Sequence, residues 1–168
     1  MAMATVMVMD MDKRKNNNPT LREVDIDEYL PVLIDIINTG EDVSLLISGN
    51  SMLPFLIDKR DTIIISKPDG NFYKGQMVFY QRVNGQYIMH RIHHIDKDGH
   101  LYLVGDAQTI IEGPIMSKQV FGVIHKVRRK GKLISHGDFW WNFFEYVWIR
   151  IVPVRRLCLK IYSLFKVF

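Results

Sequence analysis

The sequence has very little cysteine and no long apolar run. Its 168 residues include one cysteine, Cys158, so no disulfide can form within the chain. The apolar stretch Met1–Met9 has only nine residues, no positive charge before it, and Asp10 directly after it. A membrane-spanning helix needs about 20 apolar residues. We therefore predict neither a signal peptide nor a transmembrane span.

Acidic residues are scarce at the C-terminal end. Residues 128–168 hold nine Lys and Arg against Asp138 and Glu145, a net charge of +7, which leaves −3 for the rest of the chain. All three tryptophans lie in this basic tail. A basic and aromatic segment is typical of a membrane surface rather than of a nucleic-acid partner. We predict that residues 136–168 bind a membrane peripherally, at its cytoplasmic face, and that nucleic acid is no partner.

The tail also has helical spacing, which leaves a second interpretation open. Apolar residues recur at helical intervals, with Arg156, Lys160 and Ser163 on another face: Leu157, Ile161, Leu164, Phe165 and Phe168. An amphipathic helix of this kind can equally cover an open face of its own domain. Both interpretations predict C-terminal amphipathic helices.

The rest of the chain is predicted to form one domain, preceded by a polar N-terminal arm. At 48% apolar residues the chain is long enough for one real core. Residues 1–24 form the expected flexible arm, and residues 25–135 the domain. Asp25–Asn38 has helical spacing, with Pro31 in its first turn and Gly40 after its end. No second helix follows to complete a helix-turn-helix DNA reader.

From Val43 onward the pattern changes to short β-rich runs between turn residues. Asn84-Gly85 is a strong hairpin signal, and Lys97-Asp98-Gly99 marks another turn. The predicted strands are Val43–Ser48, Thr62–Ser66, Met77–Arg82, Gln86–Ile95, His100–Val104 and Val120–Arg128. The predicted fold class is therefore mainly β, with a leading helix.

The segment Ile47–Asp61 centres on Ser51, which stands between Gly49-Asn50 and Met52-Leu53-Pro54. Glycine permits backbone angles that other residues avoid, and proline fixes its own φ. A serine on such a stiff turn can present its hydroxyl and its backbone N–H together. Acyl transfer needs these two groups, a nucleophile and an oxyanion donor.

Five segments between Ile47 and Val127 share one order of motifs. They read G-N-S-M-L-P-F-L with D-K-R-D-T-I-I-I, then K-G-Q-M-V-F-Y, Y-I-M-H-R-I-H-H-I, L-Y-L-V-G-D-A-Q and V-F-G-V-I-H-K-V. This series resembles the boxes of the signal peptidase and LexA-type serine peptidase superfamily. The resemblance implies a β-ribbon catalytic domain. Arg60 and Gln76 stand where that family usually has glycine and aspartate, which marks a divergent member.

The resemblance implies His90 as the general base. In bacterial signal peptidases and LexA-type proteins the base is a lysine. In the signal peptidases of the endoplasmic reticulum and archaea it is a histidine before arginine, as in M-H-R-I here. Lys74 and Lys97 lie outside the strand position that would face the serine. Imidazole also accepts a proton near neutral pH without losing its hydration first.

An anion that orients the histidine is expected next. Asp106 matches the Gly-Asp box directly and is the favoured orienting acid. Glu112, six residues later, matches the position of a second acid and is the other candidate. The second oxyanion donor is not assigned. Signal peptidases usually carry a serine for this role two residues before the nucleophile, and Ser48 stands one position earlier than that. Asn50 or a backbone N–H could serve instead.

The predicted function is a serine endopeptidase, resembling signal peptidase, that cleaves an extended peptide. Gly49, Asn50, Met52, Leu53 and Pro54 are expected around the oxyanion and the substrate, and Phe55 could line the same surface or pack in the core. The histidines His90, His93, His94 and His100 lack a ligand set, so neither a metal nor a cofactor is expected. A non-catalytic peptide-binding or membrane-attached module is the alternative, with a LexA-type regulator less favoured. The sequence leaves the oligomeric state open.

Overall fold

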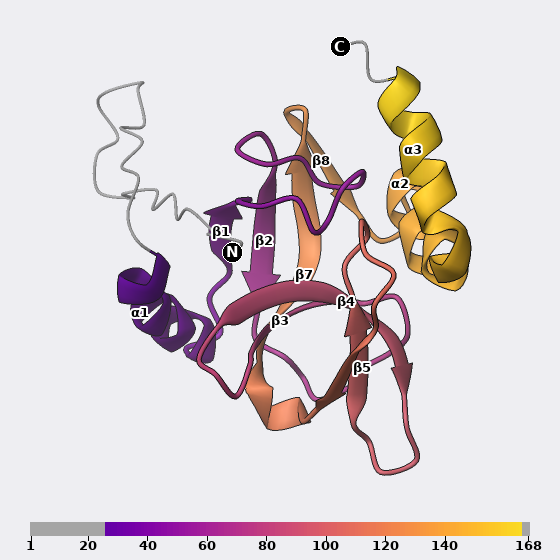
Figure 1. Ribbon diagram of the computed structural model, residues 1–168. Helices are drawn as coiled ribbons and strands as arrows, with labels where there is room; N and C mark the ends of the chain where they lie inside the picture. Colours follow the sequence, from indigo (N-terminus) through magenta and orange to yellow (C-terminus); the bar gives the residue numbers. More distant parts are fainter. Residues whose placement is uncertain (1–25, 166–168) are drawn as a thin grey trace, which may run out of the picture.

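The structure, a computed structural model, describes residues 26–165 and the side chains of residues 29–161. The predicted arm, residues 1–24, lies outside this range. The chain is mainly β, as predicted, with helices at both ends of the described range (Figure 1). The leading elements are α1 (Ile26–Asn38), β1 (Val43–Leu46), β2 (Thr62–Ser66), β3 (Met77–Gln81), β4 (Tyr87–Ile95), β5 (Leu101–Val104), β6 (Glu112–Ile115), β7 (Val120–Arg129) and β8 (Lys132–Ser135).

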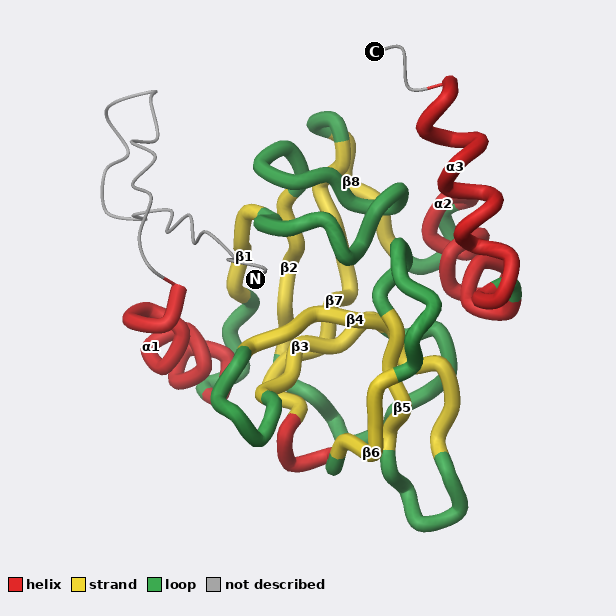
Figure 2. The backbone as a smooth tube through the Cα atoms, in the orientation of Figure 1, coloured by secondary structure: helices red, strands yellow, loops and turns green. Residues whose placement is uncertain are grey.

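The strands form one antiparallel sheet in the order β1-β2-β7-β3-β4-β5-β6, with β8 also paired to β7. The sheet is strongly coiled, so that β4 crosses in front of β7 at a steep angle in Figures 1 and 2. Such coiling follows from the right-handed twist of strands, increased at bulges. One bulge lies between Ile92 and His94 and another between Ile64 and Ile65.

Six of the strands were predicted within two residues of their ends, whereas β6 and β8 were not predicted. The sequence of β6, E-G-P-I, contains a glycine and a proline, which weaken a strand signal. Proline is tolerated there because β6 is an edge strand of the sheet. In β8 only four residues pair with the end of β7, after a turn at Lys130-Gly131.

The main core lies between α1, the first half of the sheet and the serine segment. From α1 it takes Leu30, Leu33 and Ile37, whose helical spacing was visible in the sequence. Phe55, expected either at the substrate surface or in the core, is fully buried there. A second core fills the other side of the sheet with Val78, Tyr80, Ile92, Leu101, Leu103, Ile115, Val120 and Val123.

The beginning of the tail packs onto the domain. It consists of α2 (Phe139–Asn142), a π-helical segment η2 (Phe143–Val147), two short 3-10 turns, η3 (Trp148–Arg150) and η4 (Val152–Val154), and α3 (Arg155–Phe165). Trp141, Phe144 and Trp148 are buried in the main core. This part of the tail therefore covers the domain, whereas other side chains of the same helices face outward. Among the described residues, no helix has the length and hydrophobicity to cross a membrane.

Candidate active site

The serine segment is a closed loop held at its base by Asp61. The Ile47 N–H donates to Asp61 O at 2.8 Å, and the Lys59 N–H donates to Ile47 O at 2.8 Å. The buried Asp61 carboxylate accepts hydrogen bonds from the backbone N–H groups of Ile57 and Lys130 and from the Arg60 side chain. Arg60 therefore supplies a side-chain contact where the family usually has glycine. These bonds fix the ends of the loop that carries Ser51.

Gly49 has the backbone conformation expected from the sequence. Its φ is 102°, in the left-handed region that residues with a Cβ rarely adopt, and its N–H donates to Asp58 Oδ1 at 2.8 Å. The Leu53–Pro54 peptide bond is cis. Within residues 26–165, neither the hydroxyl nor the backbone N–H of Ser51 makes a hydrogen bond. Both groups of the half-buried Ser51 therefore remain available for a substrate.

A second loop, Gly105–Gln108, lies directly against Ser51. The Ala107 N–H donates to Ser51 O at 2.8 Å. A Cβ on Gly105 would lie 2.6 Å from the same oxygen, so a side chain there would push the two loops apart. Glycine in the Gly-Asp box is therefore required for close approach of the backbone to Ser51.

Asp106 is paired with Arg91 rather than with His90. Both side chains are fully buried, and Arg91 Nε donates to the carboxylate at 3.0 Å. Arg91 Nη1 also donates to Gly75 O at 2.9 Å, and its guanidinium lies 4.8 Å from the centre of the Phe55 ring. Burial raises the pKa of Asp106, and the charges of Arg91 and Arg155 oppose that rise. Asp106 thus joins β4 to the loop beside Ser51.

His90 is connected to Glu112 through Tyr80. Tyr80 and His90 lie on neighbouring strands, and the phenol oxygen is 3.2 Å from His90 Nδ1. The phenol donates to Glu112 Oε2 at 3.0 Å, and Arg82 donates to both oxygens of the same carboxylate. Burial of Glu112 favours its neutral form, but the hydrogen bonds from Arg82 and Tyr80 outweigh it and lower the pKa of Glu112.

This network determines which nitrogen of neutral His90 carries the proton. Burial and the Glu112 carboxylate raise the pKa of the Tyr80 phenol, so Tyr80 stays neutral with one proton to donate. That proton goes to Glu112, hence the phenol oxygen accepts from His90 Nδ1–H. The Nε2 lone pair then makes no hydrogen bond within residues 26–165. Burial lowers the pKa of His90 to about 4, so the ring is neutral at pH 7.

Ser51 lies near the backbone of the two residues that flank His90 in β4. It lines an apolar pocket together with Met89, the residue before His90. Its carbonyl is bonded to Ala107, in the loop after Val104, and Val104 is the register partner of Arg91, the residue after His90. No hydrogen bond joins Ser51 Oγ to His90 among the described residues. Catalytic hydrogen bonds are often long in the absence of substrate.

The pocket beside Ser51 lies between two strand edges that have no partner in the described chain. One edge is β1, which pairs only with β2. The other is the first part of β4, because its pairing with β5 begins at Arg91. The pocket is lined by both edges and the serine loop: Leu45, Leu46, Ile47, Ser48, Gly49, Ser51, Met52, Ile63, Phe79, Tyr87, Ile88 and Met89. Of the predicted substrate contacts, Gly49 and Met52 line it, whereas Asn50, Leu53 and Pro54 are not among its lining residues.

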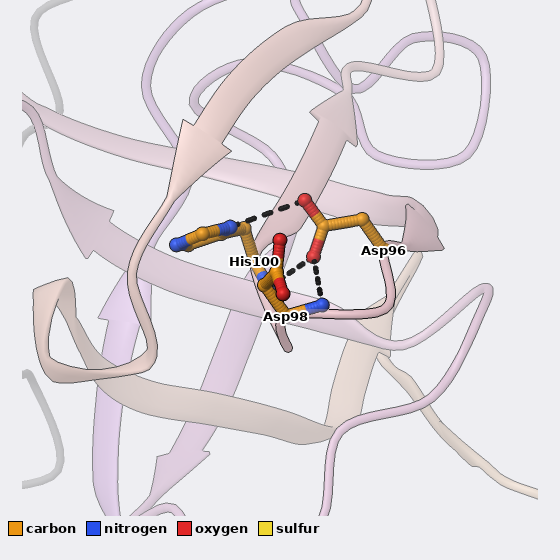
Figure 3. A group of neighbouring side chains, drawn as sticks. All are labelled: Asp96, Asp98 and His100. Atoms are coloured by element: carbon orange, nitrogen blue, oxygen red, sulfur yellow. Dashed lines mark hydrogen bonds and ion pairs between the residues drawn. The ribbon is translucent and has the colours of Figure 1, made fainter.

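The other three histidines of the predicted cluster make contacts of their own. His93 and His94 are in contact at the end of β4, and His94 stacks on Tyr102. His100 belongs to the β4–β5 turn, where its ring lies 3.1 Å from Asp96 Oδ2 (Figure 3). Asp96 Oδ1 accepts from the backbone N–H groups of Asp98 and His100 in the same turn. Three ligand-type atoms meet here, and the turn itself accounts for their contacts.

The tail contributes contacts to the candidate site that the sequence did not predict. Trp148 Nε1 donates to Asp106 O at 2.8 Å. Arg155 is fully buried and donates to Gly105 O at 2.8 Å, to Gln108 O at 3.1 Å and to Trp148 O at 3.0 Å. The tail therefore stabilises the loop Gly105–Gln108 through hydrogen bonds to its backbone carbonyls. In the sequence Arg155 is followed directly by Arg156, and nothing there distinguishes the buried arginine from the exposed one.

Tyr80 and Arg82 are the other site residues that sequence reasoning missed. Each donates a hydrogen bond to Glu112, although β4 and β5 separate β3 from β6 in the sheet order, and no spacing along the chain connects Tyr80 with Glu112. An alternation of apolar residues in β3 would assign Tyr80 to the core, where most of its ring does lie.

The coiled antiparallel sheet, with a serine loop and a Gly-Asp loop against it, is the arrangement that the resemblance to the LexA and signal peptidase superfamily implies. The family model described as Peptidase S24-like matches residues 11–127. The chain therefore belongs to this peptidase family. Searches of curated proteins and of solved structures found no match. Strand β8 and the tail lie beyond the matched residues.

Proposed function

We propose that this protein is a serine endopeptidase in which Ser51 is the nucleophile, His90 the general base, and Glu112 the acid that orients His90 through Tyr80. The observation that carries the proposal is the chain of contacts Glu112–Tyr80–His90, which leaves Nε2 of a neutral imidazole unbonded. A serine hydroxyl is a weak nucleophile until a base takes its proton. In this proposal the neutral His90 Nε2 is that base.

The proposed reaction is acyl transfer in two steps. Ser51 Oγ attacks the substrate carbonyl while its proton moves to His90 Nε2, and the carbonyl oxygen becomes an oxyanion. The unbonded N–H of Ser51 is one donor for that oxyanion. The leaving amine takes the proton from His90, and water then cleaves the acyl-enzyme by the same route in reverse. Glu112 and Tyr80 stabilise the imidazolium formed in each step.

The proposed substrate is an extended peptide segment. Its main chain would pair with the open edges of β1 and β4, and its side chains would enter the apolar pocket between them. This is β-strand addition, in which main-chain hydrogen bonds provide affinity and pockets provide specificity. The resemblance to histidine-type signal peptidases supports a preference for small residues near the cleaved bond.

Asp106 has a positioning role in this proposal. Its carboxylate is already engaged by Arg91, and its loop carries the Ala107 N–H that holds Ser51 O. We expect Glu112→Gln to lower kcat at an unchanged melting temperature, whereas Asp106→Asn lowers the melting temperature as well. A loss of turnover in Asp106→Asn alone, with the fold intact, would return the orienting role to Asp106.

The decisive experiment identifies peptides cut by the wild type, using mass spectrometry of a peptide library, and measures kcat/KM for the best of them. Ser51→Ala and His90→Ala should each lose nearly all cleavage, and the double variant little more, because residues that act as one unit are not additive. Ser117→Ala, an exposed serine away from the site, is the control. Losses that multiply in the double variant contradict a Ser51–His90 unit. If the wild type binds peptides but cuts none, the non-catalytic module is the correct interpretation.

A further inference from the structure

The beginning of the tail has an outward side that the domain does not cover. Phe139 and Trp140 of α2, and Tyr146 and Val147 of η2, are exposed although all four are large and apolar or aromatic. Together with the half-buried Phe143 they recur at helical intervals on one side of the segment. Trp141, Phe144 and Trp148, on the opposite side, fill the main core. We call the exposed set, with Phe143, the outer aromatic face.

Three rings of the outer aromatic face are in mutual contact. The rings of Phe139 and Trp140 lie 5.2 Å apart, and both contact Phe143 at 6.4 and 6.2 Å respectively. The Arg129 guanidinium lies 5.4 Å from the Trp140 ring. Exposed apolar residues continue on α3, where Leu157 is 62% and Ile161 47% exposed. A large exposed patch of this composition indicates an interaction surface.

Charge distinguishes among the surfaces that could cover this face. Between Phe139 and Ile161 the one acidic residue, Glu145, is buried. The exposed charges in this stretch, Arg150, Arg156 and Lys160, are all positive. An apolar and aromatic face flanked by exposed cations fits a surface that is apolar inside and negatively charged outside. An anionic lipid bilayer has this chemistry.

We propose that the outer aromatic face and the exposed side of α3 dock the protein onto anionic membranes, without spanning them. Tryptophan and phenylalanine would lie at the level of the lipid headgroups, and the cations would contact lipid phosphates. Docking does not depend on catalysis, so Ser51→Ala should bind membranes as the wild type does. Arg156, on the proposed membrane-binding side of α3, also lines a pocket with Glu112 and Arg82. If the proposed peptidase function holds, the membrane-binding surface therefore lies next to the residues that orient His90.

The test uses the full chain with vesicles of phosphatidylcholine, with and without phosphatidylglycerol, in a sedimentation assay. The wild type should bind the anionic vesicles, and added salt should weaken binding because it screens the cations. Phe139→Ser with Trp140→Ser should weaken binding by ~10-fold or more, given the apolar surface removed. Val83→Ser, at an apolar side chain that is 98% exposed elsewhere, is the matched control and should bind normally.

Two further measurements make the outcome decisive. Arg150→Gln with Lys160→Gln should cost about fivefold per cation at low salt, because each contributes about 1 kcal/mol near an anionic surface. Trp140 emission should shift to the blue with anionic vesicles, and Trp140→Phe should lose that shift. Equal binding by the Phe139→Ser, Trp140→Ser variant, or equal binding to neutral vesicles, would overturn the proposal. So would a concentration-dependent dimer that the same variant abolishes, because a second copy would then cover the face.

Discussion

The buried histidine makes a quantitative prediction about stability and pH. His90 is 2% exposed, and burial lowers the pKa from its ordinary value of 6.5 to about 4. Glu112 favours the protonated ring and Arg82 opposes it, but burial is the larger effect. A pKa change of this size corresponds to about 3 kcal/mol between the two protonation states. The side chain is buried, so solvent screening does not reduce this figure.

The sign of the pH effect on stability follows from how many protons His90 binds in the folded and in the unfolded protein. Between pH 6.5 and 4 the unfolded chain binds a proton at His90 that the folded chain does not, so the free energy of unfolding decreases as pH falls through this window. Relative to pH 7.5, the loss of unfolding free energy from His90 should be about 1 kcal/mol at pH 5.5 and about twice that at pH 4.5. Other groups also titrate here, so the measurement must be a difference between two proteins.

The comparison is between the wild type and His90→Asn, in which the amide nitrogen can still donate to Tyr80. Urea unfolding at pH 7.5, 5.5 and 4.5 should show that the wild type loses these amounts relative to the variant. His94→Asn, at an exposed histidine, should keep the pH dependence of the wild type. Parallel curves for the wild type and His90→Asn would refute the claim that burial holds His90 neutral. The acid limb of kcat/KM should likewise lie below pH 6.5.

Three other substitutions test how the site is held together. Tyr80→Phe removes the link between Glu112 and His90, so kcat should fall ~10- to 100-fold while circular dichroism shows an intact fold; unchanged kcat would remove Tyr80 from the relay. Arg155→Met removes the buried side-chain donor shared by three backbone carbonyls and should cost about 3 kcal/mol in urea unfolding. Arg150→Met, at an exposed arginine, should cost little, and equal losses would contradict a specific role for Arg155. Gly105→Ala should lower the melting temperature and kcat together, because its Cβ would lie 2.6 Å from Ser51 O; a neutral result would show that the two loops can separate freely.

The sequence by itself determined the fold class and the position of the serine loop. Turn signals such as Asn84-Gly85 and alternating apolar runs defined six strands, because these signals are local. The same holds for Gly49, whose positive φ is a property of the turn itself. Ser51, His90 and Asp106 could be predicted as site residues because each belongs to a motif that is contiguous in the chain, and Glu112 because of its distance from the Gly-Asp box.

Only the tertiary structure decided which side chains each candidate acid contacts and where each aromatic side chain of the tail lies. From the sequence, Asp106 and Glu112 were both candidates for the orienting acid. In the coiled sheet Asp106 contacts Arg91, whereas Glu112 contacts Tyr80. The same packing buries Trp141 and exposes Trp140, although they are neighbours in the sequence. These relations depend on contacts between segments far apart in the chain, such as Arg155 with Gly105, and on which side of a helix meets the core. Local patterns do not show contacts between distant segments, because these contacts form only when the whole sheet is assembled.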